Sequence, residues 1–119
     1  MARVVRPMAV ALGAAIVLLR VFDRVVVEGS SMSPTFLPGD RLLLVRRLRP
    51  LRPGDLVAFD DPRGTGRRLV KRVRVVRGRD VEVVGDNPAA STDSRAFGAV
   101  PIERVSHLVV RRYATGDGS

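Results

Sequence analysis

The chain has 119 residues, a formal net charge of +9, and 45% hydrophobic residues. This length suits a single domain, and the balance of charged and apolar residues is typical of a folded chain. The absence of cysteine excludes disulfides, thiolate metal sites and cysteine nucleophiles. The one histidine, His107, excludes an all-histidine metal site within one chain. Of the 21 basic residues, 20 are arginines, so Lys71 is the only lysine.

The strong positive charge first suggests nucleic acid or an anionic membrane surface as a partner. However, the arginines are spread along the whole chain, and only 4% of the residues are aromatic. Stacking platforms for single strands are therefore scarce, and no helix-turn-helix or zinc-finger pattern is present. The sequence predicts a solvated, arginine-rich surface and no nucleic-acid partner. A non-catalytic basic β module that binds nucleic acid or anionic lipid is the alternative.

The N-terminal segment contains an uncharged run, Met8–Leu19. As a helix, these 12 residues would be about 18 Å long, less than the roughly 30 Å of a bilayer core. The run fits a short membrane anchor, the hydrophobic part of a signal peptide, or a buried helix. The charged stretch Arg20–Arg24 disfavours a cleavage site, so we favour an anchor within residues 8–22. Arginines flank the run on both sides, which leaves its orientation open. Residues 1–24 are interpreted as a basic tail and hydrophobic helix.

The rest of the chain consists of short β segments separated by turn signals such as Pro-Gly-Asp. It predicts a mostly β fold, a small antiparallel domain over residues 25–113, followed by a disordered tail over 114–119. The predicted strands are Val25–Glu28, Arg41–Arg46, Leu56–Phe59, Arg68–Arg77, Asp80–Val84 and Leu108–Val110. Residues 85–98 are expected to form a long polar loop.

The predicted strand Arg68–Arg77 alternates strongly between apolar residues and arginines. Successive side chains of a strand point to opposite faces, so one face carries Leu69, Lys71, Val73 and Val75. The arginines take the other face, with Val70 and Val76 at its ends. The only lysine is therefore expected on the apolar face of its strand.

A serine-rich loop, Gly29–Thr35, follows the valine run that ends at Val27. Gly29 permits unusual backbone angles, and Pro34 fixes its own φ. Small neighbours and a rigid exit would hold the Ser31 hydroxyl exposed at the end of a strand, as a nucleophile requires. A plain Ser/Pro turn is the alternative interpretation, because such turns are common.

Lys71 is a candidate base for Ser31. Burial among apolar residues disfavours the ammonium form and lowers the pKa of a lysine, and a neutral amine can accept a hydroxyl proton. Serine–lysine pairs are a known variant of the serine–histidine arrangement. Two alternatives remain open at this point. Lys71 could stay charged at a sheet edge beside a carboxylate, or His107 could serve as the base of a triad.

The polar loop after the predicted hairpin concentrates hydrogen-bonding side chains within Gly85–Arg95. Ser91 could orient an amine, and Asp93 and Arg95 could form an ion pair if the backbone is extended there. A merely solvated loop is the alternative.

These segments together resemble the type I signal peptidases, which are membrane-bound serine–lysine endopeptidases. The resemblance rests on Ser31-Met32-Ser33-Pro34-Thr35, Gly39-Asp40, Lys71-Arg72, Gly85-Asp86-Asn87, Ser91-Thr92-Asp93-Ser94-Arg95, Gly98 and Val100-Pro101, in that order. It implies a mostly antiparallel β fold of the signal-peptidase type after a short N-terminal hydrophobic helix. It also implies Ser31 as nucleophile, Lys71 as general base and Ser91 as the hydroxyl that positions the amine. Further implied roles are a structural loop of Gly85, Asp86, Asn87, Asp93 and Arg95, and substrate contacts from Ser30, Met32 and Pro34.

The resemblance implies a protein substrate bound as an extended peptide with small residues before the cut. No metal or cofactor is needed. The product would be a protein freed of its signal peptide or N-terminal propeptide. A membrane-anchored enzyme with its catalytic domain outside the cytoplasm is expected, with a cytoplasmic enzyme as the alternative.

The chain departs from the family in two places within the predicted catalytic domain. Only 13 residues separate Lys71 from Gly85, so the large β insertion of many bacterial members is missing. Gly29 stands where some members carry a serine whose hydroxyl completes the oxyanion hole. A compact chain of this kind is similar to the proteases that mature nickel-type superoxide dismutase, and a dedicated role of that type is a second hypothesis for the substrate.

Overall fold

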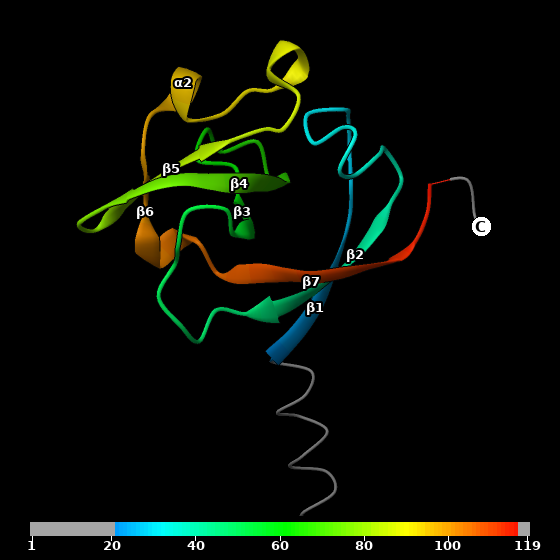
Figure 1. Cartoon of the computed structure of the whole chain (residues 1–119), viewed down its shortest axis with the longest axis horizontal. Coiled ribbons are helices and arrows are strands. Elements are labelled where there is room, and N and C mark those ends of the chain that lie inside the picture. The colour runs from blue at the N-terminus through cyan, green and yellow to red at the C-terminus, as the bar shows by residue number, and fades with distance from the viewer. Residues whose placement is uncertain (1–20, 117–119) are drawn as a thin grey trace, which may run out of the picture.

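The computed structural model describes residues 21–116 and shows a strongly curved β-sheet (Figure 1). Residues 1–20 and 117–119 lie outside the described part, and so does nearly all of the predicted anchor. The described strands are β1 (Phe22–Val26), β2 (Arg41–Arg46), β3 (Leu56–Asp60), β4 (Arg68–Arg77), β5 (Asp80–Val84), β6 (Val100–Pro101) and β7 (His107–Ala114). The prediction of a mostly antiparallel β fold is confirmed.

The seven strands form one sheet in the order β1-β2-β7-β3-β4-β5-β6, and the paired neighbours run antiparallel. Two apolar clusters hold it together. Alternate residues of β3 divide between them, because Val57 and Phe59 enter one cluster and Ala58 enters the other. Burial on both faces of the central strands explains how a small domain with few aromatic residues obtains a core.

Three predicted strands, β2, β4 and β5, have the expected bounds. Two others differ. β1 begins at Phe22, because its whole length pairs with β2 from Phe22↔Val45 onward. β7 extends to Ala114, because it pairs with β2 along nearly its full length. The backbone N–H of Gly116 then donates to Asp40 (3.0 Å), so the described part of the C-terminal segment packs against the domain.

The predicted loop 85–98 contains two short helical turns, a 3₁₀ turn at Pro88–Ala90 and the helix α2 (Ser94–Phe97). The two-residue strand β6 follows and pairs with β5. An element this short has no periodicity in the sequence, which explains why the sequence does not predict it.

The expected division of β4 into an apolar and an arginine face is only partly correct. Val70 was expected at the end of the polar face, but it is buried in the cluster that also contains Met32. The register shifts between Val73 and Val75, which changes the alternation in the second half of the strand. Lys71 itself is buried as expected, with 3% of its surface exposed.

Among residues 21–116, no helix has the length and apolar character needed to cross a bilayer. An anchor within residues 8–22 stays a prediction from the sequence.

Candidate active site

The loop that carries Ser31 connects β1 to β2 and is tied to the segment after β5. The backbone N–H of Asn87 donates to the carbonyl of Ser31 (2.8 Å), and its side-chain amide donates to the carbonyl of Ser30 (3.1 Å). Gly29 has a φ of 72°, a region that favours glycine. Asn87 therefore fixes the backbone of the serine loop, although it lies 57 residues away from Ser30 in the chain.

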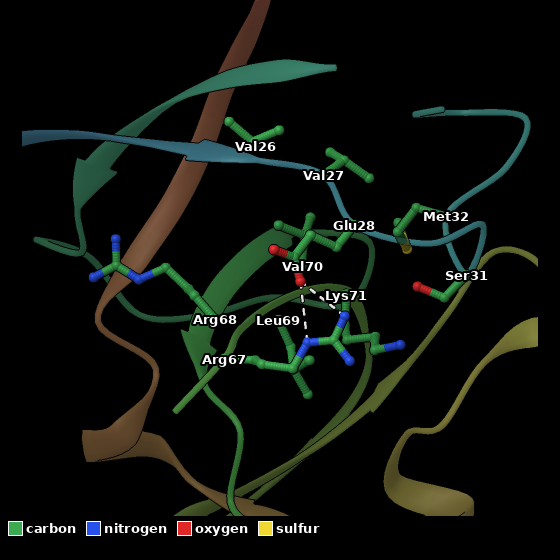
Figure 2. Close-up of a pocket in the computed structure, with 10 residues that line it drawn as sticks. All are labelled: Val26, Val27, Glu28, Ser31, Met32, Arg67, Arg68, Leu69, Val70 and Lys71. Carbon is green, nitrogen blue, oxygen red and sulfur yellow. Dashed lines mark hydrogen bonds and ion pairs between the residues drawn. The ribbon is translucent and has the colours of Figure 1, made fainter. Parts of the chain in front are cut away.

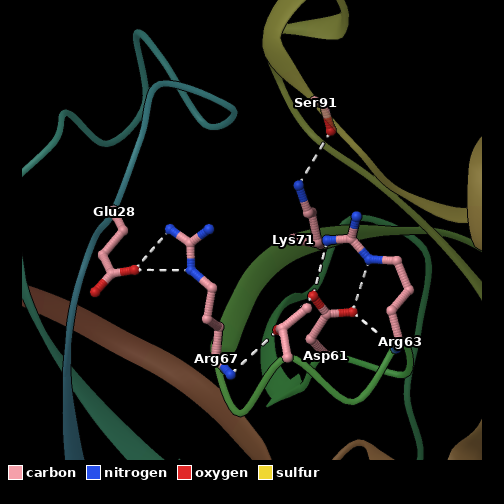
Figure 3. A network of polar contacts seen from close by, with 7 residues as sticks. Glu28, Asp61, Arg63, Arg67, Lys71 and Ser91 are labelled. Carbon is pink, nitrogen blue, oxygen red and sulfur yellow. Dashed lines mark hydrogen bonds and ion pairs between the residues drawn. The ribbon is translucent and has the colours of Figure 1, made fainter.

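The Lys71 side chain extends from β4 toward the Ser91 hydroxyl, to which its amine donates a hydrogen bond of 3.1 Å (Figure 3). The Ser91 hydroxyl in turn donates to the Asp93 carboxylate at 2.7 Å. Because the serine proton is directed at Asp93, the serine oxygen presents lone pairs to the amine. The chain Lys71–Ser91–Asp93 thus holds the amine in one orientation.

Burial is the main reason why the pKa of Lys71 lies below that of a free lysine. The Asp93 carboxylate acts against this, because a nearby negative charge favours the ammonium form. Arg63 and Arg95 lower the pKa further by repulsion, and Asp61 raises it. The net direction is downward, which increases the fraction of neutral amine near neutral pH.

Asp93 is the centre of a buried hydrogen-bond network at the start of α2. Its carboxylate accepts bonds from the Arg95 side chain (2.9 and 2.7 Å), the Arg95 backbone (3.1 Å) and the Gly85 N–H (3.0 Å). Burial alone would raise the pKa of Asp93, but these donors, with Ser91, outweigh it and lower that pKa. The ion pair of Asp93 and Arg95 is present as predicted. Asp93 itself is extended, but the chain turns into α2 at Ser94, and Asp93 caps this helix by accepting a bond from the Arg95 N–H.

Ser31 and Lys71 line the same small cavity, whose volume is about 40 Å³ (Figure 2). Its other walls come from the end of β1 with the residues after it, from the start of β4, and from the buried Met32. Within the described part of the chain, Ser31 and Lys71 are not joined by a hydrogen bond; the amine bonds to Ser91. Catalytic hydrogen bonds are often longer before substrate binds, so this separation is compatible with a catalytic pair.

Gly85 lies in close contact with both the Ser91 segment and the Ser31 loop. A Cβ atom placed there would be 2.2 Å from the Ser91 hydroxyl oxygen and 2.7 Å from the Ser31 carbonyl oxygen. Both distances are far inside van der Waals contact. Only glycine allows the Ser91 segment and the Ser31 loop to pack against the end of β5 together.

A family model described as signal peptidase, peptidase S26, matches residues 1–83. The chain belongs to the signal peptidase family. A search of curated proteins finds no match. The matched range contains Ser31 and Lys71 and ends before Gly85, so the contacts of the loop with Ser91 and Asp93 come from the structure alone.

Asp86 forms a second connection that the sequence does not predict in detail. Its carboxylate accepts two bonds from Arg72 (2.8 Å each) and one from the Thr35 hydroxyl (2.5 Å). Arg72 belongs to β4 and Thr35 to the serine loop, so Asp86 joins the strand of Lys71 to the loop of Ser31. The partners lie 14 and 51 residues from Asp86, too far apart in the chain for a sequence pattern to pair them.

We expect Arg72→Gln to lower the free energy of unfolding by about 1–2 kcal/mol, because it breaks a charged, two-pronged hydrogen bond that is partly shielded from water. Arg74→Gln is a matched control two residues further along β4. Arg74 pairs with Glu82 on the exposed surface, where an ion pair contributes about 0.2–1 kcal/mol. Urea unfolding of both variants measures the difference. Equal losses would contradict a special role for the Asp86 connection.

The remaining predicted site residues are spread over several environments. Met32 is buried and lines the cavity, whereas Ser30 and Pro34 are not among its lining residues. The Ser33–Pro34 peptide bond is cis. His107, the alternative base, lies on β7 with its Nδ1 atom 2.7 Å from the Ser106 hydroxyl, and it is also absent from the cavity wall. The cavity therefore favours Lys71 over His107 as the base.

Proposed function

We propose that this family member is a serine endopeptidase with Ser31 as nucleophile and Lys71 as general base. The observation that carries the proposal is the buried Lys71 amine, which is held by Ser91 and shares a cavity with Ser31. Burial lowers the pKa of this amine, and a neutral amine is what proton abstraction from a hydroxyl requires.

In the proposed mechanism, the Lys71 amine takes the proton of the Ser31 hydroxyl while the oxygen attacks the scissile carbonyl. The resulting ammonium gives this proton to the leaving amine as the carbon–nitrogen bond breaks, which leaves an ester on Ser31. Neutral Lys71 then takes a proton from water, and the hydroxide attacks the ester. Return of the proton to Ser31 releases the acid product. Ser91 positions the amine throughout, since its own proton is directed at Asp93.

The backbone N–H of Ser31 is the proposed donor to the oxyanion of the tetrahedral intermediate. Among residues 21–116, no backbone carbonyl in the turns and loops accepts a hydrogen bond from this N–H. The carbonyl of the same residue, in contrast, accepts a hydrogen bond from the Asn87 N–H. Gly29 supplies no hydroxyl, and its positive φ would strain a serine at that position. A site with fewer donors than usual gives up part of the stabilisation that such donors provide, about 2.7–4 kcal/mol each.

The substrate is proposed to bind as an extended strand between β1 and the first half of β4. β1 is an edge strand that pairs only with β2. Residues 68–71 of β4 pair with β3 on one side, while β5 covers only the second half, from Arg72 onward. Both walls therefore offer unpaired backbone groups to a peptide. The small cavity between them fits a short side chain before the cut, such as alanine.

The proposed reaction is removal of a signal peptide or an N-terminal propeptide from a protein substrate. Nickel-type superoxide dismutase precursor is the second hypothesis for that substrate, supported by the compact form of the chain. Membrane anchoring through residues 8–22, with the catalytic domain outside the cytoplasm, belongs to the same proposal.

The proposed function is tested by incubating the protein with a peptide that contains an Ala-Gln-Ala site. Mass spectrometry should show cleavage after the second alanine, and acid quenching early in the reaction should trap an ester on Ser31. Ser31→Ala should form neither product nor ester. Cleavage by Ser31→Ala at the wild-type rate would overturn the proposal.

Two variants are expected to shift the pH dependence of kcat/KM in opposite directions. The rate should rise with pH as Lys71 loses its proton, and it should level off below the pKa of free lysine because the pKa of Lys71 is lowered. Asp93→Asn removes a charge that raises this pKa, so the rising limb should move to lower pH. Arg95→Gln removes a charge that lowers it, so the limb should move to higher pH. A flat profile from about pH 5 to 10 would contradict a titrating amine.

A further inference from the structure

The two walls of the proposed peptide groove carry opposite charges. Asp23 and Glu28 lie on the β1 side, and Arg67 and Arg68 lie at the start of β4. Two ion pairs cross between the walls, Arg68–Asp23 at 2.7 Å and Arg67–Glu28 at 2.8 Å. β1 and β4 are not neighbours in the sheet, so these side chains bridge a gap that no strand fills.

The pair of Glu28 and Arg67 belongs directly to the cavity that contains Ser31 and Lys71 (Figures 2 and 3). Its side chains are 66% and 59% exposed, so solvent screens their attraction and the pair opens at little cost. Only one carboxylate oxygen of Glu28 is used, by Nε and Nη2 of Arg67 at 3.0 and 2.8 Å. A guanidinium group has five N–H donors, so Arg67 has donors left for a second acceptor.

An extended substrate brings one particular side chain to this pair. The residue before the cut directs its side chain into the cavity, next to Ser31. Successive side chains of a strand point to opposite sides, so the residue one position earlier points out of the cavity toward solvent. Because the side chains of Glu28 and Arg67 are more than half exposed, we place that outward side chain against their solvent-facing ends.

We propose that Glu28 and Arg67 select the charge of the substrate residue two positions before the cut, and that they favour a carboxylate there. This inference rests on the proposed function. A substrate carboxylate accepts hydrogen bonds from the Arg67 N–H groups that Glu28 does not use, or it takes the place of the Glu28 carboxylate. The net charge of +9 also attracts an anionic peptide. A substrate lysine at the same position meets Asp23 and Glu28 already paired with Arg68 and Arg67, and the net positive charge of the chain opposes it.

The test compares kcat/KM for three peptides that differ only in the middle residue before the cut: Ala-Glu-Ala, Ala-Gln-Ala and Ala-Lys-Ala. The wild-type protein should prefer glutamate over lysine by about fivefold at low salt, as expected for one exposed ion pair, and less at high salt. Arg67→Gln should remove most of the preference, and Arg67→Glu should reverse it. Glu28→Gln should strengthen the preference for glutamate, because it removes the competing carboxylate.

Arg74→Gln is the control, since Arg74 is an exposed arginine of β4 that does not line the groove cavity. It should retain the wild-type order of the three peptides. Ser31-dependent cleavage with equal kcat/KM for all three peptides would overturn this inference and leave the proposed function intact. Failure of the protein to cleave any of them in a Ser31-dependent manner would overturn the proposed function, and the inference with it.

Discussion

Lys71→Arg should lower kcat by about 10²–10⁴-fold, the range that general acid–base catalysis contributes. Arginine keeps the positive charge and approximate length of the lysine side chain, but it does not lose its proton in a protein. The variant therefore separates proton abstraction from electrostatic attraction. Single-turnover cleavage of the Ala-Gln-Ala peptide measures the effect. Wild-type activity in Lys71→Arg would exclude the amine as the base.

Ser31→Ala should lower kcat by about 10⁴-fold or more relative to the wild type, a larger loss than in Lys71→Arg, because it removes the covalent route itself. The two losses should not add in the double variant, since both residues act in the same step. A double variant with the product of the two losses would indicate that Ser31 and Lys71 act independently.

Lys71→Met controls for the stability of the Lys71→Arg variant, because arginine places a permanent charge in a buried position. Methionine is an unbranched side chain only one atom shorter than lysine, and it lacks the amine. Burial lowers the pKa of Lys71, so the unfolded state binds more protons between this lowered pKa and the usual 10.5. The wild-type free energy of unfolding should thus rise with pH across that interval. Lys71→Met should be as inactive as Lys71→Arg, and its unfolding should lack this rise.

The strands with strong alternation or clear turn signals could be predicted from the sequence, since burial on one face imposes a period of two. Arg41–Arg46 and Asp80–Val84 are examples with the expected bounds. Val70 shows the limit of this reasoning. Its face was interpreted as polar from the neighbouring arginines, but the curved sheet packs a second cluster against it.

The candidate catalytic residues could be predicted because each is chemically distinctive: a serine in a constrained loop and the only lysine in the chain. The residues that position them were harder to predict in physical terms. The link from Asp86 to Thr35 and the ion pair from Glu28 to Arg67 join segments 51 and 39 residues apart. Their geometry depends on how the sheet curves, which the local sequence does not determine.

Gly85→Ala is expected to damage both stability and activity, although it adds a single methyl group. The methyl would overlap the Ser91 hydroxyl at 2.2 Å and the Ser31 carbonyl at 2.7 Å. Overpacking of this kind costs about 1–3 kcal/mol. Relief of the overlap must move Ser91 away from Lys71 or the serine loop away from β5, and a displacement of about 1 Å in an active site can lower the rate by about 10²-fold. Urea unfolding and kcat/KM on the Ala-Gln-Ala peptide measure the two effects.

A second substitution separates the two overlaps at Gly85. In the double variant Gly85→Ala/Ser91→Gly, the hydroxyl and Cβ of residue 91 are gone, so of the three nearest contacts of the added methyl the one with the Ser31 carbonyl remains. Its stability should exceed that of Gly85→Ala, while its activity should stay low because Lys71 has lost its hydrogen-bond partner. Wild-type stability and activity in Gly85→Ala would show that the serine loop and the Ser91 segment do not need this close approach. Loss of both stability and activity in Gly85→Ala would explain why a residue without a side chain stands between the two serines. Glycine lets the Ser31 loop and the Ser91 segment pack together against the end of β5.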